Sequence, residues 1–184
     1  MQNIENTKQK LYFCTVADSR FILETVALYD SLEREALHFG EYINFWVLCI
    51  DDLAVETFKK INTNIQTISL SSLNDKELLS IKNSRKTGEF AQTSKSSLVI
   101  YLLEKLDSSC ILTFVDSDIY FYTNPALVFE DNGDWSVLIT NHWFTEKKKG
   151  FAKKVGIYNS GLISFKNNDD GKKCAELWRQ QCID

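Results

Sequence analysis

The sequence has few glycines and prolines, no long apolar run and no N-glycosylation acceptor, and each absence narrows the class of protein. One proline and seven glycines occur among 184 residues, so no linker-like segment divides the chain, and one domain over residues 1–184 is expected. No apolar run exceeds six residues, whereas a membrane-spanning helix needs about 20. The first ten residues are mostly polar, so neither a signal peptide nor a transmembrane segment is predicted.

Neither sign of charge is strongly in excess. Lysine and arginine number 21 against 25 aspartates and glutamates, which gives a net charge of −4 and a pI of about 5.3. Binding to nucleic acid requires a basic face that neutralises phosphates, so no nucleic-acid partner is predicted. Hydrophobic residues make up 44% of the chain and aromatic residues 12%, which excludes a disordered or collagen-like protein.

The five cysteines form no Cys-x-x-Cys motif. Three of them, Cys14, Cys49 and Cys110, lie within apolar runs, where a free thiol acts as a small hydrophobic side chain. The odd count and the lack of an Asn-x-Ser/Thr acceptor favour a reducing compartment. We therefore expect a cytoplasmic protein.

Apolar runs of strand length alternate with helical patterns along the chain. Strands are expected at 11–17, 42–50, 65–70, 110–115, 119–122, 135–140 and 157–165. Helices are expected at 20–36, 52–61, 74–82 and 89–106 and from about 169 onward, with Asp51 or Asp52 and then Asp169 or Asp170 as N-caps. This alternation predicts an α/β fold with a mostly parallel central sheet and helices on both faces.

A cluster of five lysines lies between 147 and 154, around a single glycine. Its commoner interpretation is an ordinary solvated loop. The alternative is a mobile flap that closes over phosphates or touches an anionic acceptor or a membrane surface. Both interpretations stay open at this point.

Two aspartates, Asp116 and Asp118, stand between apolar runs in the stretch CILTFVDSDIYFYTNP. Carboxylates two residues apart at the edge of a buried strand repel each other and lose hydration. A divalent cation with oxygen ligands removes both costs, and ligands of parallel α/β sheets bind beyond the carboxyl ends of strands. The alternative is that Asp116 caps its strand and Asp118 is solvated.

The stretch FVDSDIYFYTNP resembles the Asp-x-Asp segment of GT-A-fold nucleotide-sugar glycosyltransferases, and more narrowly that of bacterial enzymes related to family 8. The resemblance covers most of the chain through CTVADSRF, EFAQTSKSSLVIYLLEKL, VLITNHWF and GIYNSGLISFKNN. It implies a Rossmann-like GT-A fold and transfer of a sugar from a UDP or GDP type donor to a glycan or lipid-linked acceptor. Retention of anomeric configuration, cell-surface polysaccharide synthesis and peripheral contact with the inner face of the membrane are implied as well.

The resemblance also implies roles for individual residues. Asp116 and Asp118 would hold Mn²⁺ or Mg²⁺ against the diphosphate, and Asp116 would also touch the ribose. Lys95 would reach the diphosphate or the donor sugar. The nucleobase would lie against Val16, Ala17 and Asp18, and the sugars or the acceptor against His142, Asn159 and Gly161.

Three of these assignments also have a purely structural interpretation. Lys95 can be a solvated helix lysine, and the segment from Asn159 to Gly161 can be a β-bulge with a satisfied asparagine. A lone histidine such as His142 is more often packed and hydrogen-bonded. Relatives of the family have a basic residue directly after this histidine. Trp143 stands there in this chain, which puts a basic contact at that position in doubt.

Family members usually carry a further C-terminal part that completes the metal and acceptor sites, and this chain is expected to lack it. A non-catalytic sugar-nucleotide-binding module and a purely structural α/β domain are therefore alternatives. A HAD-type phosphatase also begins with strand-Asp-x-Asp, but it needs Thr or Val where this chain has Tyr120. A nucleotidyltransferase usually shows a Gly-rich first loop, which ADSRF is not.

Overall fold

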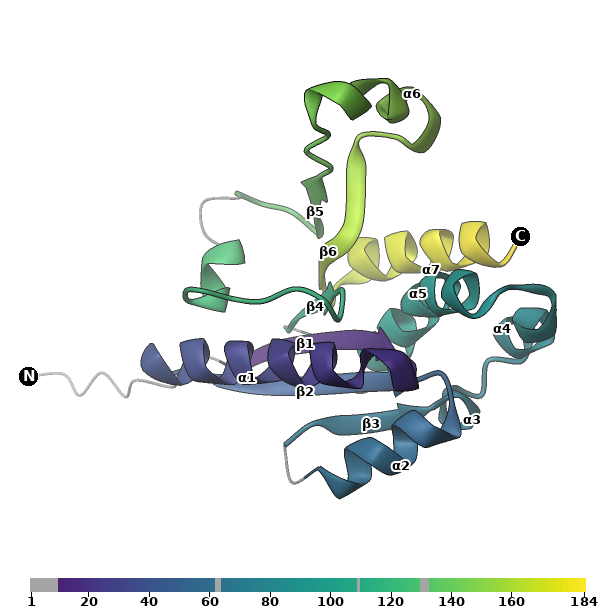
Figure 1. Ribbon diagram of the computed structural model, residues 1–184. Coiled ribbons are helices and arrows are strands. Elements are labelled where there is room, and N and C mark those ends of the chain that lie inside the picture. The colour runs from purple at the N-terminus through teal and green to yellow at the C-terminus, as the bar shows by residue number, and fades with distance from the viewer. Residues whose placement is uncertain (1–9, 62–63, 109, 130–132) are drawn as a thin grey trace, which may run out of the picture.

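A computed structural model describes residues 10–61, 64–108, 110–129 and 133–184. Its centre is a six-stranded sheet in the order β3-β2-β1-β4-β6-β5 (Figure 1). Strands β1 to β4 pair in parallel, and β6 is antiparallel to both β4 and β5. The strands are β1 (Lys10–Ala17), β2 (Tyr42–Cys49), β3 (Gln66–Ser69), β4 (Ile111–Val115), β5 (Val137–Asn141) and β6 (Tyr158–Lys166). The predicted α/β class with a mostly parallel sheet is confirmed.

Helices cover both faces of the sheet, as predicted (Figure 1). Successive residues of β1 point to opposite faces: Phe13 packs into a core beneath α1 (Ile22–His38) and α2 (Asp52–Lys60), and Cys14 packs into a core beneath α5 (Thr87–Lys105) and α7 (Asp169–Ile183). Within the described residues, no helix is both long and apolar enough to cross a bilayer. The helices are α1 (Ile22–His38), α2 (Asp52–Lys60), α3 (Leu70–Leu73), α4 (Lys76–Ile81), α5 (Thr87–Lys105), α6 (Ala152–Val155) and α7 (Asp169–Ile183).

The helix starts follow the cap chemistry of the sequence, with one correction. Asp51 caps α2 as predicted, since its Oδ1 accepts from the Ala54 N–H at 2.7 Å. Helix α7 begins after Asn168, whose Oδ1 accepts from the Gly171 N–H at 2.8 Å, so the prediction of Asp169 or Asp170 as cap is wrong. Asn and Asp cap about equally well, so position in the fold decides between neighbours.

The prediction of a strand at 119–122 is also wrong. Strand β4 already pairs with β1 on one side and β6 on the other, so β4 has no free side with which this segment could pair. It crosses the α1 face instead: the Phe121 N–H donates to Ser31 Oγ at 3.1 Å, and the Phe121 ring lies 5.8 Å from the Phe13 ring. Ile119 and Phe121 pack against the core without forming a strand, whereas Tyr120 and Tyr122 stay exposed.

The connection between β5 and β6 projects from the body as a hairpin (Figure 1). It contains a 3-10 helix at Glu146–Phe151 followed directly by α6. The lysine cluster therefore lies on short helical turns and not on the predicted loop. All five lysines are exposed there, as a solvated segment requires.

Candidate functional site

A cleft of about 180 Å³ opens at the carboxyl ends of β1 and β4, beside the first turns of α5. It joins segments that are 100 residues apart in the chain, because the parallel strands end at one edge of the sheet. Six of the predicted site residues line it, together with residues that the sequence did not single out. The lining residues are Val16, Ala17, Asp18, Arg20, Phe21, Gly88, Ala91, Gln92, Lys95, Asp116, Ser117 and Asp118.

Lys95 is a buried cation at the floor of the cleft. Only 3% of the residue is exposed, and its Nζ lies 2.6 Å from Oδ1 of Asp116 and 5.0 Å from the centre of the Phe114 ring. The interpretation of Lys95 as a solvated helix lysine is therefore wrong. A buried ammonium is stable only with partners of this kind, so the ion pair positions the Asp116 carboxylate.

Asp118 is exposed, whereas Asp116 is half-buried and paired with Lys95. The chain turns at the end of β4, where the Ile119 N–H donates to the Asp116 carbonyl at 3.2 Å and Asp118 turns out to solvent. The expectation that both carboxylates lose hydration is therefore wrong for Asp118, and the solvated alternative for Asp118 is confirmed. The metal itself stays a prediction, which now depends on the donor atoms at the cleft.

The donor atoms fit a hard divalent cation. Both Asp116 and Asp118 line the same cleft and offer carboxylate oxygens, the ligands that Mn²⁺ and Mg²⁺ prefer. Among the described residues, no three His, Cys, Asp or Glu side chains group as a metal site. A cation held here would therefore draw further oxygen ligands from water and from a bound diphosphate.

The loop after β1 is held by an ion pair between Asp18 and Arg20. Asp18 is only 3% exposed and accepts from Arg20 Nη2 at 2.6 Å and from the Arg20 N–H at 2.9 Å. The Arg20 guanidinium holds the pKa of the Asp18 carboxyl below its usual range. Arg20 was missed from the sequence, although an arginine two residues after an aspartate in ADSRF was a usable signal.

Gly161 lies directly beside Asp116. The Asp116 N–H donates to the Gly161 carbonyl at 2.8 Å, and a Cβ on Gly161 would lie 3.1 Å from Oδ2 of Asp116. The pairing of β5 with β6 shifts here, between Ile139 and Thr140, and Asn159 Oδ1 accepts from the Gly161 N–H at 3.0 Å. The bulge with a satisfied asparagine is thus confirmed, and it touches the motif aspartate.

His142 does not line the cleft. It follows β5 on the projecting hairpin, where its ring stacks on Phe144 at 4.0 Å and its backbone N–H donates to the Ile157 carbonyl at 2.7 Å. His142 is an exposed residue, so the interpretation of His142 as a packed residue is wrong. A sugar or acceptor contact from His142 stays a prediction, because the described geometry does not bring it to the two aspartates.

The amino-terminal end of α5 forms one wall of the cleft through Gly88, Ala91 and Gln92. A 19-residue helix carries a partial positive charge at this end, which favours an anionic ligand. The helix was predicted from 89 onward, but its orientation toward the motif could not be inferred from periodicity.

No family model matches the chain. Two uncharacterized proteins of Bacillus subtilis are similar to it: YfnF, 28% identical over 179 residues, and YfnD, 25% identical over 174 residues. Each match covers 94% of this chain, which spans 58% of YfnF and 55% of YfnD.

Among solved structures, galactosyltransferase LgtC in complex with donor and acceptor sugar analogues is similar at a TM-score of 0.60 and 15% identity, over 94% of this chain and 64% of that one. The bifunctional glycosyltransferase WbbM is similar at a TM-score of 0.59 and 14% identity, over 100% of this chain and 38% of that one. At these identities the likeness shows the fold alone, which is GT-A-like.

Proposed function

We propose that this chain carries the donor-binding part of a metal-dependent glycosyltransferase. The donor is a nucleoside diphosphate sugar of UDP or GDP type, and the acceptor is a glycan or a lipid-linked molecule. One observation carries the proposal: the loop after β1, the buried Lys95 and the carboxylates of Asp116 and Asp118 meet in one cleft at the carboxyl edge of the sheet. The GT-A-like fold supports this proposal over the phosphatase alternative.

Different residues of the cleft match different parts of the proposed donor. Val16 and Ala17 supply an apolar wall for a flat nucleobase, and Asp18 and Arg20 supply polar groups at its edge. The positive end of α5 and the Lys95 ammonium face the region where a diphosphate would lie. Each element therefore matches one chemical feature of a nucleoside diphosphate.

Transfer breaks the bond between the anomeric carbon and the diphosphate oxygen and forms a bond to an acceptor oxygen, which loses its proton. Asp116 and Asp118 would hold Mn²⁺ or Mg²⁺, which when bound offsets negative charge on the leaving diphosphate. Lys95 holds the Asp116 carboxylate in place and adds a fixed positive charge beside it. Gly161 leaves room at Oδ2 of Asp116. A side chain at position 161 would crowd this carboxylate oxygen, which is a proposed metal ligand.

The test is calorimetric titration with UDP and GDP sugars, with and without Mn²⁺, on the wild-type chain and on Asp118→Ala. Asp118 is exposed, so its loss leaves the fold intact while removing a proposed metal ligand. We expect affinity in Mn²⁺ to fall on the order of tenfold or more. Asp30→Ala, at an exposed position on α1, is the matched control and should bind like wild type.

A second readout observes the metal ion directly. Electron paramagnetic resonance of Mn²⁺ with the nucleotide should show a bound ion in wild type and a weakened one in Asp118→Ala. Absence of metal-dependent binding to every nucleotide sugar would contradict the proposal.

A second candidate is a sugar-nucleotide-binding module without turnover. It is favoured by the lack of a three-ligand metal group among the described residues. Nucleotide binding without hydrolysis or transfer of the donor sugar, in a protein that extends over the full length of those relatives, would identify this module.

A further inference from the structure

The β5–β6 hairpin has a surface that the cleft does not use. The surface, called here the hairpin tip, comprises residues 142–158 and carries five lysines against one glutamate in a chain whose net charge is −4. Glu146 pairs with Lys149 at 2.5 Å, so the net positive charge of the hairpin tip comes from the four other lysines. They are Lys147, Lys148, Lys153 and Lys154, and all four are exposed.

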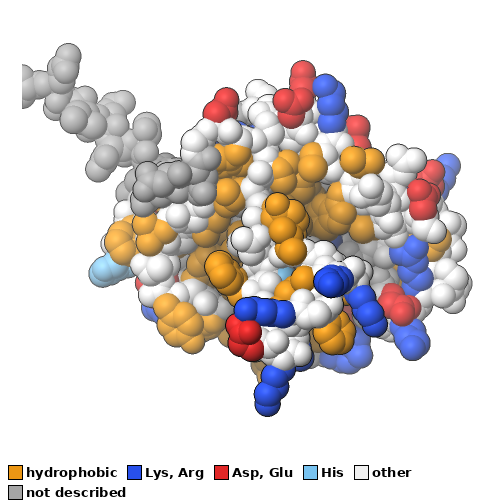
Figure 2. All heavy atoms as spheres, turned by 90° about the horizontal axis from the view of Figure 1, so that it is seen from above, with side chains coloured by type: hydrophobic (Ala, Val, Ile, Leu, Met, Phe, Trp, Pro, Cys, Tyr) orange, Lys and Arg blue, Asp and Glu red, His pale blue; other side chains and the backbone are white. Residues whose placement is uncertain are grey.

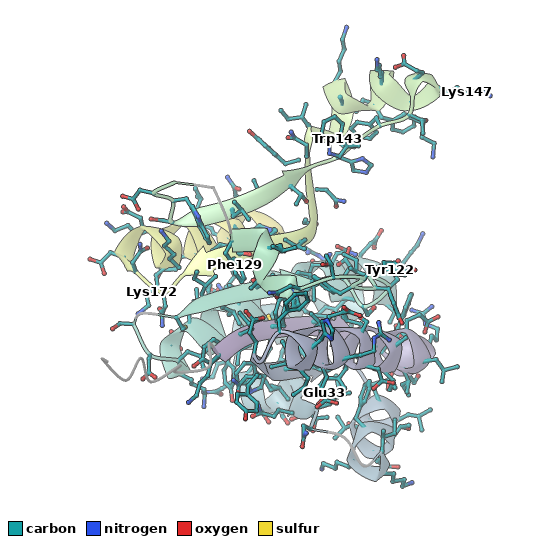
Figure 3. The ribbon with its side chains drawn as sticks, turned by 90° about the vertical axis from the view of Figure 1, so that its left-hand side faces the viewer. Glu33, Tyr122, Phe129, Trp143, Lys147 and Lys172 are labelled. Carbon is teal, nitrogen blue, oxygen red and sulfur yellow. The ribbon has the colours of Figure 1, made fainter. Side chains whose placement is uncertain are left out.

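Apolar side chains lie exposed among these lysines. Trp143 is 88% exposed, Val155 63% and Phe151 54%. Figure 3 shows Trp143 on the arm of the hairpin and Lys147 at its end, both away from the body. Figure 2 looks down on this side of the molecule and shows blue and orange side chains next to one another. Scattered single apolar residues are ordinary on a surface, whereas here an exposed tryptophan, phenylalanine and valine belong to one lysine-rich segment of the chain.

We propose that the hairpin tip docks on a bilayer that contains anionic lipid. Lysines near such a surface are attracted by its negative potential, and exposed tryptophan and phenylalanine partition into the headgroup region. Lysines alone would also suit a soluble polyanion, and exposed aromatic side chains alone would also suit a neutral protein surface. Their combination on one protrusion matches a charged interface with an apolar layer beneath it, which neither of those two partners provides.

The topology places the tip on the cleft side of the sheet. Strand β6 runs antiparallel to β4, and its residues before Leu162 extend past the end of β4 at Val115, where Gly161 touches Asp116. The hairpin therefore leaves the sheet at the same edge that bears the cleft. A docked tip would hold that edge toward the lipid surface.

The experiment is flotation with vesicles of phosphatidylcholine alone and of phosphatidylcholine with 30 mol% phosphatidylglycerol, a chosen composition. We expect binding only to the anionic vesicles, with release at high salt. Lys147→Gln/Lys148→Gln/Lys153→Gln/Lys154→Gln should weaken binding by roughly fivefold per lysine, so by a hundredfold or more. The matched control changes four exposed lysines elsewhere, Lys59, Lys60, Lys76 and Lys173, to Gln, and it should retain most of the binding.

Trp143 gives a second readout that tests the apolar part. Its emission should shift to the blue on anionic vesicles and be quenched by brominated lipid, and Trp143→Phe should bind yet lose the shift. The proposal is overturned if wild type does not float, or if the control loses as much binding as the tip variant. It is equally overturned if Trp143 emission is unchanged and heparin binds as tightly as the vesicles. All of these measurements concern lipid alone, so their result is independent of nucleotide binding.

Discussion

The parallel strands of the sheet and the β5–β6 hairpin differ most in what surrounds them. Phe13 on β1 is fully buried between strands and helices, whereas Ile139 on β5 is 40% exposed and Phe151 on the hairpin tip 54% exposed. Both regions contain apolar residues, but β6 joins the core through Ile163 and Phe165, and no residue of the hairpin tip is buried. The difference separates a packed part, which shapes the cleft, from a protruding part whose apolar residues are available for contact.

The largest expected effect is a core truncation that the hairpin should not reproduce. Phe13→Ala removes a fully buried ring that contacts Phe121, so we expect a loss of about 3–5 kcal/mol in the free energy of unfolding. Phe151→Ala should stay within about 0.5 kcal/mol of wild type. Urea unfolding measures both, and an equal loss at Phe151 would mean that the hairpin tip is packed and not exposed.

The next effect compares an ion pair of the body with one of the hairpin tip. Arg179 on α7 donates to Asp75 at the start of α4, with Nε 2.8 Å from Oδ2, and only 12% of the Asp75 side chain is exposed. Asp75→Asn should cost about 2 kcal/mol at pH 7. Glu146→Gln, which removes the exposed partner of Lys149, should cost no more than about 0.5 kcal/mol.

The same pair predicts a pH dependence. Burial raises the pKa of Asp75, but the hydrogen bonds from Arg179 and from the Leu78 N–H outweigh it and set the pKa below its usual range. The stabilisation is therefore complete above the unfolded aspartate pKa of about 3.9 and is lost as the pH falls through the lowered folded value. Urea unfolding from pH 7 to pH 3 should show the difference between wild type and Asp75→Asn shrinking over this window. A constant difference would contradict it.

The smallest effect on stability should carry a clear effect on the cleft. Gly161→Ala places a methyl group 3.1 Å from Oδ2 of Asp116, so we expect about 1 kcal/mol of destabilisation and roughly tenfold weaker Mn²⁺-dependent nucleotide binding. Gly150→Ala on the hairpin tip meets no atom within 4 Å and should change neither. Calorimetry with UDP and GDP sugars checks this comparison. Unchanged binding in Gly161→Ala would mean that Oδ2 of Asp116 does not bind the metal ion.

Much of the fold could be predicted because each parallel strand is marked by an apolar run in its own sequence. The near-continuous apolar run at 42–50 is a strand because helices bury both of its faces. The stretch 119–122 has similar apolar character but is no strand, because β4 has no free edge for it. Strand formation there depends on partners that are far away in the chain.

The candidate site divides in the same way. Asp116 and Asp118 could be found from the chemistry of paired acids after an apolar run, and Val16 to Asp18 from the resemblance. Lys95 was also predicted from the resemblance, but its role as the counterion of Asp116 could not be, because the distance from Lys95 to Asp116 depends on how α5 packs across β4. His142 lies on the hairpin away from the aspartates for the same reason, since the sequence does not encode how far a connection projects.

The sequence alone determined the α/β alternation, the cap at Asp51 and the acidic motif, because each depends on residues within one or two turns of chain. The tertiary structure decided which charges pair, which apolar residues stay exposed, and which glycines cannot be replaced. Gly171 illustrates the point: a Cβ there would lie 2.1 Å from the Lys166 carbonyl oxygen, a clash that no local pattern reveals. Burial and electrostatic pairing depend on distances in space, and those distances exist only once the strands and helices have packed.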